Sequence, residues 1–220
     1  MFVRLVQDAV KVWMMEVLNT KLLQTVRQIG EASKNYVEHP NEASFTKALS
    51  DHVWKEKGVS LLFVCTHNSR RSHLSQYWAY VMATYFQIPI LGSYSAGTEE
   101  TAVYPSVIRS MEHSGAVVDV LREGPNPIYA IRIGEAMPVM LGFSKTISSP
   151  INPKADLLAV MTCTQADEAC PYIEAAAQRI SLPFVDPKFS DGTPEESTKY
   201  LEKSNEIAMV MYRVFSAVKK

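Results

Sequence analysis

From Val59 onward, short apolar runs alternate with segments of helical spacing, and this alternation limits the fold more than any other feature of the chain. In chain order, the pattern predicts strands at 59–64, 88–95, 157–162 and 180–185, and helices at 72–86, about 105–114 and 195–218. Strands that alternate with helices indicate an α/β fold, with a central, mostly parallel sheet and helices on both faces. Two further strands, Asn126–Ile133 and Met137–Phe143, are separated by Gly134-Glu135 and predict an inserted hairpin.

Residues 1–58 have a different pattern, in which apolar side chains recur at helical spacing in two stretches. The first stretch runs to Ile29, and the second contains Phe45 and ends near Gly58. The sequence therefore predicts an N-terminal helical extension over 1–58 and a main domain over 59–220. A chain of 220 residues is long enough for one sizeable core.

Composition argues against several classes of partner. The formal net charge is −1, and the basic residues are scattered rather than gathered in a stripe, so no nucleic-acid partner is predicted. No apolar run approaches the roughly 20 residues that a membrane span needs. Three cysteines, an odd number, argue against a disulfide framework, and the N-terminus lacks the pattern of a secretion signal. A reducing cytoplasm is the expected location.

The segment Cys65–Ser72 directly follows the first predicted strand and precedes a predicted helix. In a strand–loop–helix unit, successive backbone N–H groups can point inward and bind a tetrahedral oxyanion. A cysteine at the entrance of this loop lies near a helix N-terminus and near Arg71, and both favour the nucleophilic thiolate. Asn68 tolerates the left-handed backbone of a sharp loop, and Ser72 can donate a hydrogen bond to the sulfur. We therefore predict that Cys65 attacks an oxyanion.

The other two cysteines follow a later strand. Cys163 comes directly after 157–162, and Cys170 lies seven residues further on. Because parallel strands end at the same edge of a sheet, Cys163 is expected to approach Cys65. An adduct on Cys65 could then be resolved by Cys163, and the disulfide passed to Cys170. Three thiols could instead bind zinc, but the Cys163–Cys170 spacing is long, so no metal site is predicted.

A single aspartate follows the last predicted strand. Asp186 precedes Pro187 at the end of 180–185. A carboxylic acid above an anion site can protonate a departing oxygen as general acid. Aspartate before proline is also common in turns, so the position at a strand end supports the catalytic interpretation.

These motifs together resemble a known family. Cys65–Ser72, Tyr94–Gly97, Cys163 to Pro171 and Asp186-Pro187 occur in the order seen in the low-molecular-weight protein tyrosine phosphatase superfamily. Within it, the chain most resembles the thioredoxin-coupled arsenate reductases, and a branch from Bacteroidetes-type bacteria generally labelled protein-tyrosine phosphatase. The resemblance covers roughly residues 59–217.

The resemblance implies a role for each motif. Cys65 would be the nucleophile, Asn68 would hold the loop, Ser72 would stabilise the thiolate, and Asp186 would be the general acid. Oxyanion binding would fall to the loop residues Thr66, His67, Asn68, Ser69, Arg70 and Arg71. In the reductases, Cys163 would displace arsenite from Cys65, Cys170 would take over the disulfide, and thioredoxin would reduce it.

Some positions depart from the family pattern. His67 stands where glycine is usual, and Arg70 where a second cysteine is frequent. Lys188-Phe189 replaces the aromatic pair of the phosphatases. Gln76 stands where many reductases have a glutamate that helps to bind potassium, so the grounds for a potassium site are weak. No resident cofactor is expected.

Two other functions remain open at this point. The chain could be a phosphatase that hydrolyses phosphotyrosine or a small phosphoester through a phosphocysteine on Cys65. It could also be an anion-binding module without turnover, which the nucleophile and its acid argue against. Arsenate reduction is preferred because every cysteine in the chain matches a position of the relay.

Overall fold

The computed structural model describes residues 17–55, 58–169 and 172–218. Four parallel strands form the main sheet in the order β2-β1-β6-β7, which confirms the predicted α/β fold. Their bounds are β1 Ser60–Cys65, β2 Gly92–Gly97, β6 Leu157–Met161 and β7 Ala176–Ser181. A second, antiparallel sheet has the order β3-β4-β5, with bounds Val117–Arg122, Ile128–Arg132 and Met140–Gly142.

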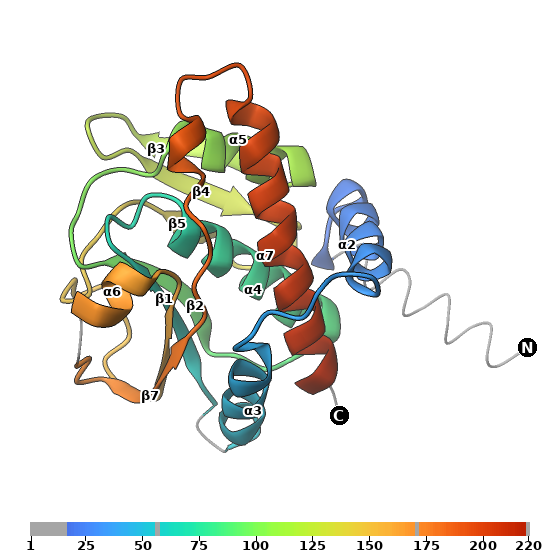
Figure 1. Ribbon diagram of the computed structural model, residues 1–220, viewed down its shortest axis with the longest axis vertical. Coiled ribbons are helices and arrows are strands. Elements are labelled where there is room, and N and C mark those ends of the chain that lie inside the picture. The colour runs from blue at the N-terminus through green and yellow to red at the C-terminus, as the bar shows by residue number, and fades with distance from the viewer. Residues whose placement is uncertain (1–16, 56–57, 170–171, 219–220) are drawn as a thin grey trace, which may run out of the picture.

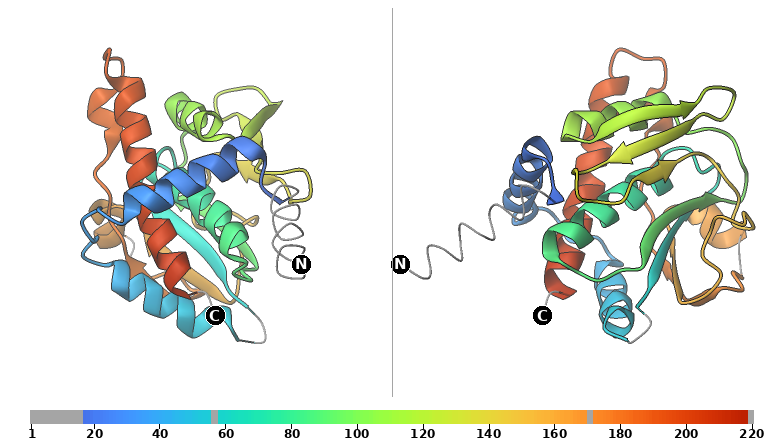
Figure 2. Two further views of the ribbon diagram at one scale, coloured as in Figure 1. Left: turned by 90° about the vertical axis from the view of Figure 1, so that its right-hand side faces the viewer. Right: turned by 180° about the vertical axis from the view of Figure 1, so that it is seen from behind.

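The helices lie around these sheets (Figure 1). Their bounds are α2 Thr20–Ser33, α3 Glu42–Val53, α4 Arg71–Phe86, α5 Pro105–Ser114, α6 Thr164–Ala169 and α7 Glu196–Val218, with a 3₁₀ turn at Pro187–Ser190. The long helix α7 packs on α4, and α2 and α3 pack on α7. Views from two further sides show the second sheet set apart from the main sheet, next to α5 (Figure 2). None of the helices in the described ranges is long and apolar enough to cross a membrane.

Strand β1 is buried on both faces because its side chains alternate between two cores. Leu61 and Phe63 point into the large core shared with α3, α4 and α7. Leu62 and Val64 point into a smaller core on the other face, where α6 packs. Because β1 is central and its neighbours are parallel to it, its C-terminal end at Cys65 is held on both sides.

The N-terminal extension contributes directly to the large core. In α2, the buried side chains recur at helical spacing, and Asn19 caps the helix by accepting a hydrogen bond from the Leu22 amide at 3.0 Å. In α3, Phe45 packs edge-on against Phe63 of β1, with ring centroids 6.3 Å apart. The predicted helical pattern at residues 1–16 lies outside the described residues, and α3 ends at Val53 rather than near Gly58.

Several predicted boundaries are wrong, and proline helps to explain one of them. The strand predicted at 88–95 begins only at Gly92, because the Ile88 amide caps α4 by bonding to Ala83 O and Pro89 has no N–H to donate. The strand predicted at 180–185 runs instead over Ala176–Ser181. Beyond its end, Leu182 N and Phe184 N still donate to Met161 O and Thr162 O, at 2.8 and 3.1 Å. The predicted hairpin is present as β4 and β5, but β3 extends it to a sheet, and α6 was not predicted.

Candidate active site

The loop between β1 and α4 forms a cup of backbone amides. Among the described residues, none accepts a hydrogen bond from the N–H groups of 67–70, which leaves four donors free for a ligand. Asn68 has a left-handed backbone (φ 44°), as the sharp loop requires. The loop ends at the N-terminus of α4, whose dipole favours an anion at this place.

Two carbonyl groups of the loop, those of Thr66 and His67, accept hydrogen bonds from residues outside it. These bonds fix the orientation of the peptide groups in the loop. Thr66 O accepts hydrogen bonds from Glu99 N at 2.8 Å and from Thr98 Oγ1 at 3.1 Å. His67 O accepts hydrogen bonds from Thr101 Oγ1 at 2.9 Å and from Ser144 Oγ at 3.1 Å. The amides therefore point away from the turn after β2.

A short chain of hydrogen bonds ends on the sulfur of Cys65. The amide of Lys145 donates to Asn68 Oδ1 at 2.8 Å, and Asn68 Nδ2 donates to Ser72 Oγ at 2.9 Å. Because Ser72 Oγ already accepts from Asn68, its own hydrogen is free to point to Cys65 Sγ, 3.1 Å away. A donor aimed at sulfur stabilises the negative charge of a thiolate. Cys65 itself is buried beneath the loop.

Arg71 and Asp186 face each other beside the loop. Arg71 Nη2 lies 2.5 Å from Asp186 Oδ2, and Arg71 Nη1 donates to Phe184 O at 3.2 Å. Arg71 Nε is buried and has no partner among the described residues, so one donor of the guanidinium is unused. The guanidinium therefore has a donor available for an oxyanion in the cup.

Arg70 takes a different direction from Arg71. Its Nε donates to Tyr200 OH at 2.6 Å, its Nη2 pairs with Asp191, and its guanidinium lies 4.4 Å from the centre of the Tyr104 ring. The side chain thus ties the loop to α7, and only the backbone N–H of Arg70 belongs to the cup.

Cys163 lies next to the loop, at the end of β6. Its Sγ is 3.6 Å from Thr66 Oγ1, and it accepts a hydrogen bond from Ala166 N at 3.4 Å. Cys65 and Cys163 are both free thiols and belong to the same small core. Cys170 lies outside the described residues. The structure thus brings two of the three predicted relay cysteines to one edge of the sheet.

A cavity of about 700 Å³ joins the predicted site residues. Arg71, Cys163 and Asp186 all line it, together with His67 and Lys188. The second cysteine of the predicted relay, the cation and the predicted acid therefore open on one space beside the amide cup, whereas Cys65 is not among the lining residues.

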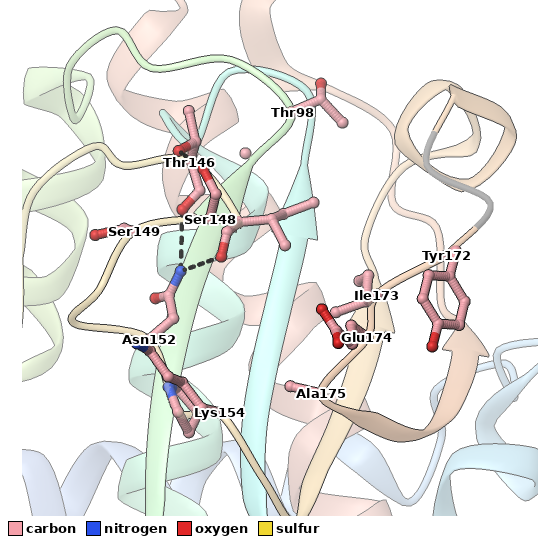
Figure 3. A pocket seen from close by; sticks show the side chains of 13 residues that line it. Thr98, Thr146, Ser148, Ser149, Asn152, Lys154, Tyr172, Ile173, Glu174 and Ala175 are labelled. Carbon is pink, nitrogen blue, oxygen red and sulfur yellow. Dashed lines mark hydrogen bonds between the residues drawn. The ribbon is translucent and has the colours of Figure 1, made fainter.

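A larger pocket, of about 1080 Å³, lies behind the loop (Figure 3). It is lined by 97–98, 146–149, 152–154 and 172–175. Asn152 Nδ2 donates to Thr146 O and Ile147 O at 3.0 Å. None of its described lining residues is a cysteine. The smaller cavity is therefore the candidate site, while this pocket adjoins the chain that follows Cys170.

Two buried basic residues near the loop, His73 and Lys145, were not predicted from the sequence. His73 Nε2 donates to Asn68 O at 3.0 Å, and its Nδ1 accepts from Ser95 Oγ at 3.2 Å. Burial, with the nearby charge of Lys145, lowers the pKa of His73 to about 3, so this imidazole is neutral. Burial also lowers the pKa of Lys145 to about 8. Lys145 lies 77 positions from Asn68, so no local pattern could have indicated it.

Two curated relatives match the chain over most of their own length. The chain is 28% identical over 140 residues to an arsenate reductase of Halalkalibacterium halodurans, a match that covers 62% of this chain and 79% of that protein. It is 26% identical over 144 residues to an arsenate reductase of Bacillus subtilis, covering 65% and 84%. Both of these similar proteins are named arsenate reductases. The resemblance predicted from the sequence is thereby confirmed.

Comparisons with family models and with solved structures are less informative than the two curated relatives. No protein-family model matches the chain. A solution structure of a low molecular weight protein tyrosine phosphatase from Bacillus subtilis has a TM-score of 0.49 at 14% identity, covering 73% of this chain and 97% of that one. A thioredoxin-dependent arsenate reductase from Corynebacterium glutamicum has a TM-score of 0.39 at 14% identity, covering 89% and 85%. With scores this low, the argument for function rests on the site and on the curated relatives.

The potassium site considered above does not fit the residues present. Gln76 Nε2, not an oxygen, contacts the carbonyls of Ser93 and Leu141, at 3.1 and 3.5 Å. Gln76 Oε1 is buried without a partner in the described structure, but a single oxygen is a poor donor set for a hard cation. We therefore derive no step through potassium.

Proposed function

We propose that this protein reduces arsenate to arsenite through Cys65, Cys163 and Cys170 in turn. One observation carries the proposal: the thiol of Cys65 lies under free loop amides, and that of Cys163 opens on the cavity beside them. The names of the curated relatives support arsenate as the substrate.

The first step uses the cup and the acid. Arsenate binds to the amides of 67–70 and to Arg71, and its negative charge competes with Asp186 for the guanidinium. The Cys65 thiolate attacks arsenic, an S–As bond forms and an oxygen leaves as water. Asp186 supplies a proton to that oxygen once it is released from Arg71. The product of this step is a thiol–arsenate adduct.

The second step moves two electrons to arsenic. The Cys163 thiolate attacks the sulfur of Cys65, an S–S bond forms, the S–As bond breaks, and its electron pair stays on arsenic, which leaves as arsenite. Cys170 then attacks Cys163, which frees Cys65 and leaves a Cys163–Cys170 disulfide. An external dithiol, for which thioredoxin is the candidate, is oxidised to a disulfide and returns both cysteines to thiols.

Phosphoester hydrolysis is the second candidate, and it needs only the cup, Cys65 and the Arg71–Asp186 pair. The same cup can bind a phosphoryl group, and Cys65 can form a phosphocysteine. Asp186 can protonate the departing phenolate oxygen of phosphotyrosine or another aryl phosphate. Water would then hydrolyse the intermediate without any need for Cys163. The two functions therefore differ in whether Cys163 is required.

Steady-state assays of three proteins test the proposal. Wild type, Cys65→Ser and Cys163→Ser are supplied with arsenate, thioredoxin, its reductase and a reductant, and arsenite is measured. We expect turnover only in wild type. Turnover by Cys163→Ser would refute the relay. Hydrolysis of an aryl phosphate that is lost in Cys65→Ser, with no arsenite from wild type, would show that the phosphatase alternative is correct.

A further inference from the structure

The loop after β7, Pro183–Asp186, carries the proposed general acid and is held from several sides. Phe184 N donates to Thr162 O at 3.1 Å, and Phe184 O accepts from Arg71 Nη1 at 3.2 Å. Asp186 pairs with the same guanidinium. We call residues 183–186 the acid strap. Two of its contacts depend on Arg71, the residue that the oxyanion must also use.

The N-terminal extension supplies another contact to the acid strap. His39, in the linker between α2 and α3, has its Nε2 2.8 Å from Pro183 O. Its ring also packs on the Phe184 ring, with centroids 5.3 Å apart. A contact between residues 144 positions apart thus links the extension to the loop that carries Asp186.

The tautomer of His39 follows from its second nitrogen. Asn41 N–H donates to His39 Nδ1 at 3.3 Å, so Nδ1 is an acceptor and the ring hydrogen lies on Nε2. Nε2 therefore donates to the carbonyl of Pro183. The neutral ring makes both hydrogen bonds at once, which fixes its orientation against the strap.

The linker that carries His39 is itself anchored to α7. Arg213 Nε donates to Glu42 Oε1 at 2.7 Å, and Arg213 Nη1 donates to Tyr36 O at 3.2 Å. Glu42 is buried, so this ion pair is shielded from solvent on one side. His39 therefore connects the acid strap to a linker that is held in place by α7.

We propose that His39 is a positioning residue for Asp186, and that the N-terminal extension thereby forms part of the catalytic machinery. When an oxyanion draws Arg71 away from the strap, the bonds from His39 and to Thr162 keep the strap in place. Asp186 then stays above the departing oxygen. This inference rests on the proposed function, because it assumes that Asp186 acts as an acid.

The first test compares two leaving groups. Dinitrophenol leaves without a proton, whereas phenol needs one, so only phenyl phosphate depends on the acid. We expect His39→Ala to lower kcat/KM for phenyl phosphate about tenfold. Its kcat/KM for dinitrophenyl phosphate should stay within about twofold of the wild-type value. His39→Gln, which keeps a donor for Pro183 O, should restore most of the loss. His52→Ala is the matched control, because His52 contacts Ala48 O within its own helix.

A double variant separates positioning from general damage. In Asp186→Asn, the acid is already lost, so adding His39→Ala should cost nothing further. An equal loss with both leaving groups, or a full additional loss in the double variant, would overturn the proposal. If wild type acts on arsenate alone, wild type, His39→Ala, Asp186→Asn and the double variant are compared instead. The quantity measured is then the rate of arsenite release in a single turnover.

Hydrogen exchange tests the contact without relying on catalysis. The Phe184 amide should exchange about tenfold faster in His39→Ala than in wild type, and at the wild-type rate in His39→Gln and His52→Ala. An unchanged rate in His39→Ala would overturn the positioning role. Faster exchange in a protein that turns over neither arsenate nor aryl phosphates would instead refute the proposed function and leave the contact established.

Discussion

At the scale of single residues, the hydroxyl of Ser72 is the group that acts most directly on the nucleophile. Hydrogen bonds to charged groups contribute about 1.5–3 kcal/mol. Ser72→Ala should therefore slow the alkylation of Cys65 by iodoacetamide at neutral pH by about tenfold to a hundredfold. The measurement is the rate of label incorporation at Cys65, followed by mass spectrometry of the Cys65 peptide.

Ser75 provides the matched control, one turn further along α4. It is fully buried, and its hydroxyl has no hydrogen-bond partner in the described structure. Ser75→Ala should leave the alkylation rate of Cys65 unchanged. Equal rates in Ser72→Ala and wild type would show that the hydroxyl does not stabilise the thiolate.

The buried imidazole of His73 predicts a pH dependence of stability. Its pKa is lowered from 6.5 to about 3, so the unfolded chain binds the proton more tightly than the folded protein. This stabilisation is complete above pH 6.5 and is lost as the pH falls towards 3, by about 1.4 kcal/mol per pH unit. Urea unfolding at a series of pH values measures this loss. As the pH falls, the free energy of unfolding should decline less steeply in His73→Gln than in wild type. The exposed His113→Gln should follow wild type; parallel curves for all three proteins would contradict the assignment.

The sequence around Cys65 was enough to predict the roles of residues within the loop. It could not indicate which residues from distant parts of the chain contact the loop. The left-handed backbone of Asn68 and the contact of Ser72 with Cys65 follow from a motif of eight residues. Lys145 and His39 act through contacts with partners 77 and 144 positions away, which no periodicity encodes. The direction of Arg70 likewise depends on Tyr200 of α7.

At the scale of secondary structure, the packing of β2 against the loop depends on a glycine. A Cβ on Gly97 would lie 2.4 Å from Glu99 O and 2.7 Å from Asn68 N, both backbone atoms. Gly97→Ala must therefore displace the amide cup. We expect about tenfold weaker protection of Cys65 by arsenate against alkylation. Gly92→Ala on the same strand is the control, because its Cβ would meet only the Tyr94 side chain; equal protection in both variants would contradict this role.

Elements with a continuous apolar run were predictable, and elements at the edges were not. β1 and β6 are central and buried on both faces, so their sequences show uninterrupted apolar runs. β7 is an edge strand with exposed Ala177 and Gln178, so its pattern is weak and the apolar residues after it were taken for the strand. β3 is also an edge strand, and most of its side chains are exposed.

At the scale of the whole molecule, the N-terminal extension and the sheet share one core. Phe45 is fully buried against β1, so Phe45→Ala should lower the free energy of unfolding by about 3–5 kcal/mol. Urea denaturation should show a single transition at lower midpoint. Val37→Ala, at a position that is 83% exposed, is the control. A separate early transition in Phe45→Ala, with the main transition unchanged, would show that the extension unfolds independently.

The proposed relay requires three cysteines to act in order, and a single turnover reveals that order. Reduced protein is mixed with arsenate in the absence of any external reductant, free thiols are alkylated, and the peptides are mapped by mass spectrometry. The account predicts one arsenite per protein, a Cys163–Cys170 disulfide and an alkylated Cys65. Arsenate left unchanged, with all three thiols alkylated, would contradict it.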